Sequence, residues 1–193
     1  MSRNADRPLE TRTVLSGAAA GLFAYLFGYL VTYVWQSGAV EERLRGFNLL
    51  AQVVGGDPIP TWKAIAWLFY NAHFVTTRLP ALGGSRSVNF VAESDAAGLT
   101  LLYAVPPLLL LVAGALTALF TAVSTPRNSA LAGAATMPGY LVPAVVVANL
   151  SSYAVGDAAV APTLVTATLL AGVVYPLVFG TLGGVLAGLV GSA

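Results

Sequence analysis

The sequence predicts an all-α membrane protein, a four-span transmembrane helical bundle with an extracytoplasmic helical segment between spans one and two. Residues 96–193 carry only two charged side chains, Arg127 and Asp157, which leave uncharged runs of 31, 29 and 36 residues. A fourth uncharged run lies between Arg12 and Glu41. An apolar run of about 18 residues or more is long enough to cross the bilayer core as a helix.

The composition agrees with this class and excludes several others. Only 9% of the residues are charged, against about 25% in soluble domains. The 193 residues fit a single membrane domain over 1–193. A net charge of +1 gives no basic field for nucleic acid. The absence of cysteine excludes disulfides and cysteine-ligated metals.

The first span is predicted over residues 14–35. The basic residues before it are Arg3, Arg7 and Arg12. They place its start on the cytoplasmic side by the positive-inside rule. Its apolar run exceeds the 7–15 residues of a signal peptide and ends in Tyr33 and Trp35, an aromatic interfacial anchor. We therefore expect this span to remain in the mature protein.

The outer segment, residues 36–96, is predicted to begin with an amphipathic helix over about 39–54, after a polar break at 36–38. Apolar residues recur there at steps of three and four, which is typical of one helix face. They are Val40, Leu44, Phe47, Leu50 and Val54. Residues 55–58, Gly-Gly-Asp-Pro, end this helix.

The next part of the outer segment, residues 61–77, is apolar but dense in aromatic and polar groups. The residues that we assign to the membrane interface are Trp62, Trp67, Tyr70 and His73. Aromatic side chains favour the interface, and an ionisable group at mid-bilayer is costly. We therefore predict a helix that lies at the outer membrane surface or packs on the bundle, with a fifth span as the alternative.

The remaining spans are predicted over about 97–122, 130–150 and 163–190, and residues 79–95 are predicted to form a loop. Four spans place Arg127 on the cytoplasmic side with both termini, and Asp157 outside. A fifth span at 61–77 would reverse these two loops. The short loops therefore favour four spans.

Small residues four apart mark faces for close helix packing. The packing candidates are Gly17, Gly21, Gly180, Gly184 and Gly188. Packing within the monomer and a homo-oligomer seam both fit this pattern.

Tyrosines of the spans are candidates for lining a cavity: three lie four apart on one face of the first span, and three precede prolines. They are Tyr25, Tyr29, Tyr33, Tyr103, Tyr140 and Tyr175. The prolines, Pro106, Pro107, Pro138, Pro143 and Pro176, each remove a backbone hydrogen bond. Broken helices around a binding site and ordinary kinks in a packed bundle are the two interpretations.

Residues for chemistry are absent from the four predicted spans, which contain no Asp, Glu, Lys, Arg or His. His73 is the single histidine and has no cysteine or second histidine with which to hold a metal. The chain also has no phosphate-binding glycine loop. We predict no catalytic residue, no cofactor and no metal, and a protein that is not an enzyme.

The segment Trp62–Val75 follows one N-terminal span and precedes a compact group of spans. In this segment and its position the chain resembles a family of small multi-pass membrane proteins from haloarchaea. That family is a domain of unknown function, loosely labelled as a transporter. The resemblance covers nearly the whole chain, and it implies an all-helical membrane fold with no assigned activity.

Two functions follow as hypotheses for a multi-pass protein of the cell membrane, whose first partner is the lipid bilayer. The first is a non-enzymatic subunit or scaffold of a membrane assembly, as a homo-oligomer or with a membrane partner protein. The alternative is a small transporter or channel for a neutral or apolar solute. A polar cavity at the level of the tyrosines would favour transport.

Overall fold

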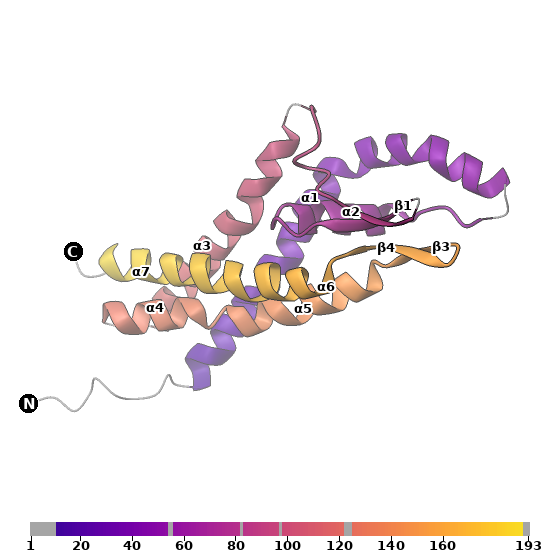
Figure 1. The fold of residues 1–193 in the computed structure, drawn as a ribbon. Helices are drawn as coiled ribbons and strands as arrows, with labels where there is room; N and C mark the ends of the chain where they lie inside the picture. The colour runs from indigo at the N-terminus through magenta and orange to yellow at the C-terminus, as the bar shows by residue number, and fades with distance from the viewer. Residues whose placement is uncertain (1–10, 54–55, 82, 97, 122–124, 191–193) are drawn as a thin grey trace, which may run out of the picture. The chain divides into compact units, whose positions relative to one another are not determined.

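Four long helices dominate the computed structural model, which describes residues 11–53, 56–81, 83–96, 98–121 and 125–190. They run over Thr11–Val53, Leu99–Phe120, Pro126–Leu150 and Leu164–Val190 (Figure 1). Within the described residues these four are long and apolar enough to cross a membrane. A largely helical fold with four candidate spans is therefore confirmed, and a small β-sheet accompanies it.

The chain divides into two compact units. The helical unit contains the described residues of Met1–Tyr25, Pro107–Pro143 and Gly172–Ala193. The mixed unit contains those of Leu26–Pro106 and Ala144–Ala171, and it includes all four strands. The single domain expected from the sequence stays a prediction.

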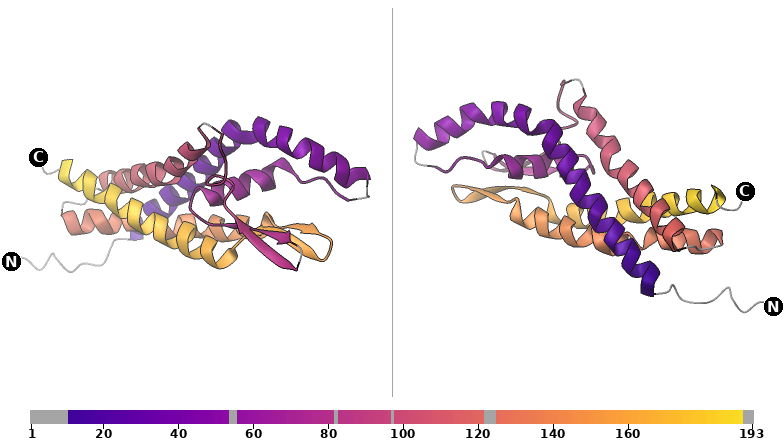
Figure 2. Two further views of the ribbon diagram at one scale, coloured as in Figure 1. Left: turned by 45° about the horizontal axis from the view of Figure 1, so that its top comes forward. Right: turned by 180° about the vertical axis from the view of Figure 1, so that it is seen from behind.

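Helix α1 (Thr11–Val53) continues without interruption through the polar residues 36–38, where the sequence analysis placed a break. The first span and the amphipathic helix are thus one helix of 43 residues, about 64 Å long. Ser37 and Gly38 are weak helix formers, but neither removes a backbone hydrogen bond as proline does. The helix curves in its second half instead of ending (Figure 2).

Helix α2 (Thr61–Asn71) is shorter than the predicted helix over 61–77 and, with 11 residues, too short to span a bilayer. It ends because Phe74 adopts a left-handed conformation, with φ of 59°. The Val75 amide then donates to the Tyr70 carbonyl, which is the hydrogen bond of a Schellman C-cap. A glycine usually occupies this position, so no local residue signals the end of the helix here.

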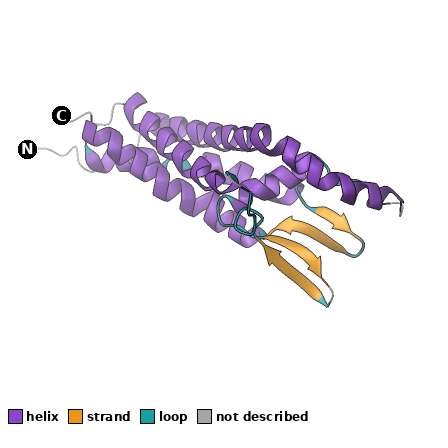
Figure 3. Ribbon diagram, turned by 90° about the horizontal axis from the view of Figure 1, so that it is seen from above, coloured by secondary structure: helices purple, strands orange, loops and turns teal. Residues whose placement is uncertain are grey.

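A four-stranded antiparallel sheet replaces two regions that were predicted to be loops (Figure 3). Its strands are β1 (Thr77–Ala81), β2 (Gly84–Val88), β3 (Tyr153–Val155) and β4 (Ala158–Pro162). The order β2-β1-β4-β3 joins two hairpins through the pairing of β1 with β4. These strands are short, and their central pairing connects residues far apart in the sequence, so local patterning could not reveal them.

Prolines distort the two helices that follow the outer segment. A 3-10 turn, η1 (Leu99–Ala104), leads into α3 (Val105–Phe120), whose first turn holds Pro106 and Pro107. Residues 135–136 form a turn between α4 (Pro126–Ala134) and α5 (Met137–Leu150), where Pro138 cannot donate to the Ala134 carbonyl.

The last helix has a widened central part. It begins as α6 (Leu164–Thr166), continues as the π-helical stretches η2 (Ala167–Val174) and η3 (Pro176–Gly180), and ends as α7 (Thr181–Val190). Pro176 has no N–H for the carbonyl four residues before it, and i to i+5 bonding accommodates this loss. Pro143 lies inside α5 without ending it.

Each unit has its own core. In the mixed unit α2 is central, because residues 64–71 are all buried against α1, the sheet and η1. In the helical unit α7 lies beside α4 (Figure 1), and Ala187 and Ala132 of these helices cluster with Ala118 of α3. The helical unit thus depends on close backbone approach and the mixed unit on large side chains.

Candidate functional site

Helix α2 covers the C-terminal end of α5. The Trp67 indole nitrogen donates to the Ser151 carbonyl at 3.0 Å, and the Lys63 ammonium donates to the Ser152 carbonyl. Carbonyls at the end of a helix lack partners within it and carry partial negative charge. Two donors one turn apart on α2 therefore satisfy the end of α5 and fix the start of the β3–β4 hairpin.

The second half of α1 is tied to the residues around the start of α2. The Asn48 side chain accepts from the Ile59 amide at 2.8 Å and donates to the Ile59 carbonyl at 3.3 Å. The Tyr29 hydroxyl donates to the Trp62 carbonyl at 2.9 Å. These bonds hold α1 alongside α2 up to residue 48, so the last turns of α1 have a fixed position in the mixed unit.

An asparagine junction joins the end of α2 to the β1–β2 hairpin and the turn after it. The Asn71 amide donates to the Val75 carbonyl at 2.7 Å, and its oxygen accepts from the Phe90 amide at 2.8 Å. The Asn89 side chain donates to the Asn71 carbonyl at 3.2 Å and accepts from the Val91 amide at 3.0 Å. The junction satisfies buried polar groups and thereby positions the hairpin.

His73 lies in the turn after α2 and is fully buried. Its Nδ1 donates to the Phe69 carbonyl at 2.7 Å, and its ring meets the Phe69 ring edge-on at 4.8 Å. Burial lowers the pKa of His73 to about 4, although the hydrogen bond to Phe69 opposes this shift. The side chain is therefore neutral near pH 7 and acts as part of the core.

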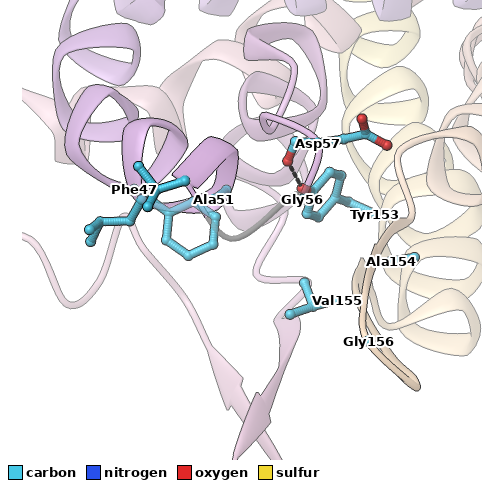
Figure 4. Close-up of a pocket in the computed structure, with 10 residues that line it drawn as sticks. Phe47, Ala51, Gly56, Asp57, Tyr153, Ala154, Val155 and Gly156 are labelled. Atoms are coloured by element: carbon cyan, nitrogen blue, oxygen red, sulfur yellow. Dashed lines mark hydrogen bonds between the residues drawn. The ribbon is translucent and has the colours of Figure 1, made fainter.

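An apolar groove lies between the last turns of α1 and the β3–β4 hairpin (Figure 4). Its volume is about 590 Å³, and its lining residues are Phe47, Leu50, Ala51, Val53, Gly56, Asp57, Tyr153, Ala154, Val155 and Gly156. The Tyr153 hydroxyl donates to the Asp57 carbonyl, which joins the two walls. Apart from Asp57 and Tyr153, every lining residue is apolar or a glycine.

The predicted amphipathic face of α1 has a buried part and an exposed part. Val40 is buried and Leu44 packs against the core of the mixed unit, as that face predicts. Phe47 and Leu50, however, are 48% and 70% exposed. Val53 is 84% exposed, and Val54 lies outside the described residues. The outer part of this face therefore has no covering element in the described chain.

The five predicted packing glycines all lie against other helical segments of the helical unit. A Cβ on Gly17 or Gly21 would overlap with Ala135 or Thr136. A Cβ on Gly180 would meet Gly133 and Thr136. On Gly184 it would meet the Ser129 carbonyl, and on Gly188 the Ser129 side chain. Four further glycines that were not predicted make such contacts: Gly114, Gly133, Gly139 and Gly183. Gly114 is four residues before Ala118, a spacing that could have indicated it.

The six candidate cavity tyrosines lie in different surroundings. Tyr25 and Tyr140 are buried edge-on against each other in the helical unit, and Tyr175 meets Phe179 there. Tyr29, Tyr33 and Tyr103 belong to the mixed unit, where Tyr29 contacts Phe69 and Tyr103 stacks on Phe74. None of the six lines the groove.

The predicted interfacial residues of α2 are placed mostly inward. Trp62 is 39% exposed, whereas Trp67, Tyr70 and His73 are buried. The Tyr70 hydroxyl donates to the Ala144 carbonyl of α5. The helix packs against other segments of the mixed unit. The interfacial position of these four residues stays a prediction.

In the part of the chain that the structure describes, no three His, Cys, Asp or Glu side chains gather to hold a metal ion. No curated protein matches the sequence, and no solved structure matches the fold. A model of DUF7978, a family of unknown function, matches residues 1–191. The chain belongs to this family of unknown function, DUF7978.

Proposed function

We propose that this protein is a four-span integral membrane protein with both termini in the cytoplasm. The four apolar helices and the arginines at positions 3, 7, 12 and 127 support this orientation. In this arrangement the sheet and the second half of α1 lie on the extracytoplasmic side. Three uncharged spans with short connections leave little room for a soluble catalytic domain.

The function that we propose is that of a non-enzymatic subunit, which holds a partner protein through the groove between α1 and the β3–β4 hairpin. The observation that carries the proposal is the exposed apolar wall of Phe47, Leu50 and Val53. Contiguous apolar surface rimmed by polar residues is typical of interaction sites. The volume of the groove suits a few apolar anchor side chains of a partner.

A protein partner suits this groove better than lipid chains do. Val53 lies 18 residues beyond Trp35, the predicted end of the first span, which is about 27 Å along a helix. The charged residues Glu41, Glu42, Arg43 and Arg45 come between. Such a charged stretch is unfavourable in hydrocarbon, so the groove beyond it lies outside the bilayer core. Protein side chains are therefore better suited to cover the groove than acyl chains are.

Photo-crosslinking in native membranes tests the proposal. A photoreactive phenylalanine at Leu50, in the groove, is expected to give one discrete protein adduct. The same group at Glu42, an exposed position outside the groove, is the matched control and is expected to give none. Leu50→Asp, combined with the photoreactive group at Phe47, should abolish the adduct because a carboxylate would be desolvated in the interface.

Three outcomes would overturn the proposal. They are an adduct with lipid alone, equal adducts at Leu50 and Glu42, and an adduct at Phe47 that survives Leu50→Asp. An adduct of twice the chain mass that contains only this chain identifies the partner as a second copy, which is the homo-oligomeric form of the same proposal. Folding of each variant is checked by its melting temperature in detergent.

A transporter for a neutral or apolar solute was the alternative. It depends on tyrosines that line a common cavity, whereas Tyr25 and Tyr140 are fully packed against each other. We therefore prefer the subunit.

A further inference from the structure

The sheet of the mixed unit has two unlike faces. Thr77, Val88 and Val160 on one face are buried toward α2. The strand register places small residues around a single arginine on the other face. That outer face comprises Arg78, Pro80, Ser85, Ser87, Ala154, Ala159 and Ala161. A covered face and an open face are usual for an antiparallel sheet.

A cavity of about 430 Å³ lies over this outer face. Its other wall comes from the end of α5, with Ala148, Asn149 and Ser152, and from Leu164 at the start of α6. Arg78 is the one ionisable residue among those that line the cavity, and no carboxylate lines it. The site is therefore shaped for a group that carries negative charge.

The Arg78 side chain is exposed and forms no hydrogen bond or ion pair with any described residue. Arg86, on the neighbouring strand and the opposite face, differs because it pairs with Glu93 at 2.8 Å. A guanidinium presents a planar fork of donors that suits phosphate oxygens. Lys63, bonded to the Ser152 carbonyl, adds a second positive charge behind the wall of the cavity.

Apolar residues continue from the cavity onto the adjoining helices. Leu150, at the end of α5, is 60% exposed, and Leu164 and Val165, at the start of α6, are 42% and 69% exposed. These helices are two of the four candidate spans. A ligand that reaches Arg78 and also covers these residues has an anionic head and apolar chains.

We infer that this cavity is a binding site for the phosphate headgroup of an anionic phospholipid, with Arg78 as its anchor. The lipid chains lie along Leu150, Leu164 and Val165, and the small residues of β1, β2 and β4 leave room for the headgroup. The inference rests on the proposed membrane placement and is independent of the groove between α1 and the β3–β4 hairpin.

Lipid binding to the purified full chain in a neutral detergent tests the inference. We expect phosphatidylglycerol to raise the melting temperature and to remain bound in native mass spectrometry, and phosphatidylcholine to do neither at the same concentration. Arg78→Gln should weaken phosphatidylglycerol binding by about tenfold, the loss of one charge-assisted contact. Arg86→Gln removes the same charge from the other sheet face and should leave binding unchanged.

A second variant fills the cavity and keeps the charge. Ala159→Trp lies on an exposed position of β4, and its ring should exclude the headgroup while the melting temperature without lipid stays within a few degrees of the parent. Loss of lipid binding in this variant would support the site even if Arg78→Gln folded poorly.

Several results would overturn the inference. Equal loss in Arg78→Gln and Arg86→Gln would mean general charge attraction, and no loss in either would mean another site. Glycerol phosphate in solution that binds as tightly as the lipid would make free phosphate the ligand. Because these measurements are made in detergent, they do not depend on orientation, and side-specific cysteine labelling tests the membrane placement separately.

Discussion

At the scale of single residues, His73 shows how an ionisable group is accommodated in this fold. Its ring is buried and neutral, held by the Phe69 carbonyl and ring. The sequence predicts a helix over 61–77 that includes His73, whereas the residue lies in the turn after α2 and in the core. Its burial depends on a left-handed turn at Phe74 and on the Asn71 junction, and neither has a local sequence signal.

We expect His73 to make stability depend on pH. Its folded pKa of about 4 is below the unfolded value of 6.5, so the unfolded chain binds the proton more readily. The stabilisation is complete above pH 6.5 and is lost as the pH falls from 6.5 to 4, by a total on the order of 3 kcal/mol. Chemical denaturation in detergent between pH 7.5 and 5 measures it. His73→Gln should flatten this dependence, and an unchanged slope would mean that another group titrates.

Ser129 in α4 offers a second test at this scale. Its hydroxyl is buried beside Gly188 and has no hydrogen-bond partner among the described residues. A buried unsatisfied hydroxyl costs about 1–3 kcal/mol. Ser129→Ala should therefore stabilise the protein by about 1 kcal/mol in thermal unfolding.

Ser151→Ala is the matched control for Ser129→Ala. The Ser151 hydroxyl is also buried, but it donates to the Ala148 carbonyl at 3.3 Å. Removing it should give no gain in stability. Similar losses in both variants would show that the Ser129 hydroxyl is satisfied in solution.

At the scale of elements, the helices could be predicted from local sequence, whereas the pairing of the strands could not. Each long helix follows from an uncharged run, because hydropathy and helix formation are properties of neighbouring residues. The pairing of Thr77 with Pro162 joins residues 85 positions apart, and no local pattern encodes it. For the same reason the α1 wall of the groove was predictable as an apolar face, whereas Tyr153–Gly156 was not.

Glycine packing between α7 and α4 gives the test at this scale. Gly184→Ala should destabilise the protein by about 1–3 kcal/mol, because the new methyl group would overlap with the Ser129 carbonyl. Gly38→Ala in α1 meets no atom within 4 Å and should stabilise by about 0.5–1 kcal/mol through helix propensity. Thermal unfolding in detergent compares the two. Equal effects would mean that α7 and α4 are not closely packed.

At the scale of the whole molecule, the membrane topology determines on which side of the membrane each proposed site lies. The chain has no cysteine, so single cysteines report position directly. With four spans, cysteines that replace the exposed residues Asp95 and Asp157 should react with an impermeant maleimide on intact cells. A cysteine at Arg127 should react only after permeabilisation. Five spans would give the reverse at all three positions.

The order of synthesis gives the pairing of β1 with β4 a further consequence. When a ribosome has made residues up to the start of α3, β1 and β2 exist, but β4 does not. The Ser151 and Ser152 carbonyls that receive Trp67 and Lys63 are also missing at that time. The outer segment must therefore wait for the third span to be inserted before it completes its sheet. A chain cut short before residue 150 would retain an unpaired strand edge and two unsatisfied donors, features that mark it for aggregation or proteolysis.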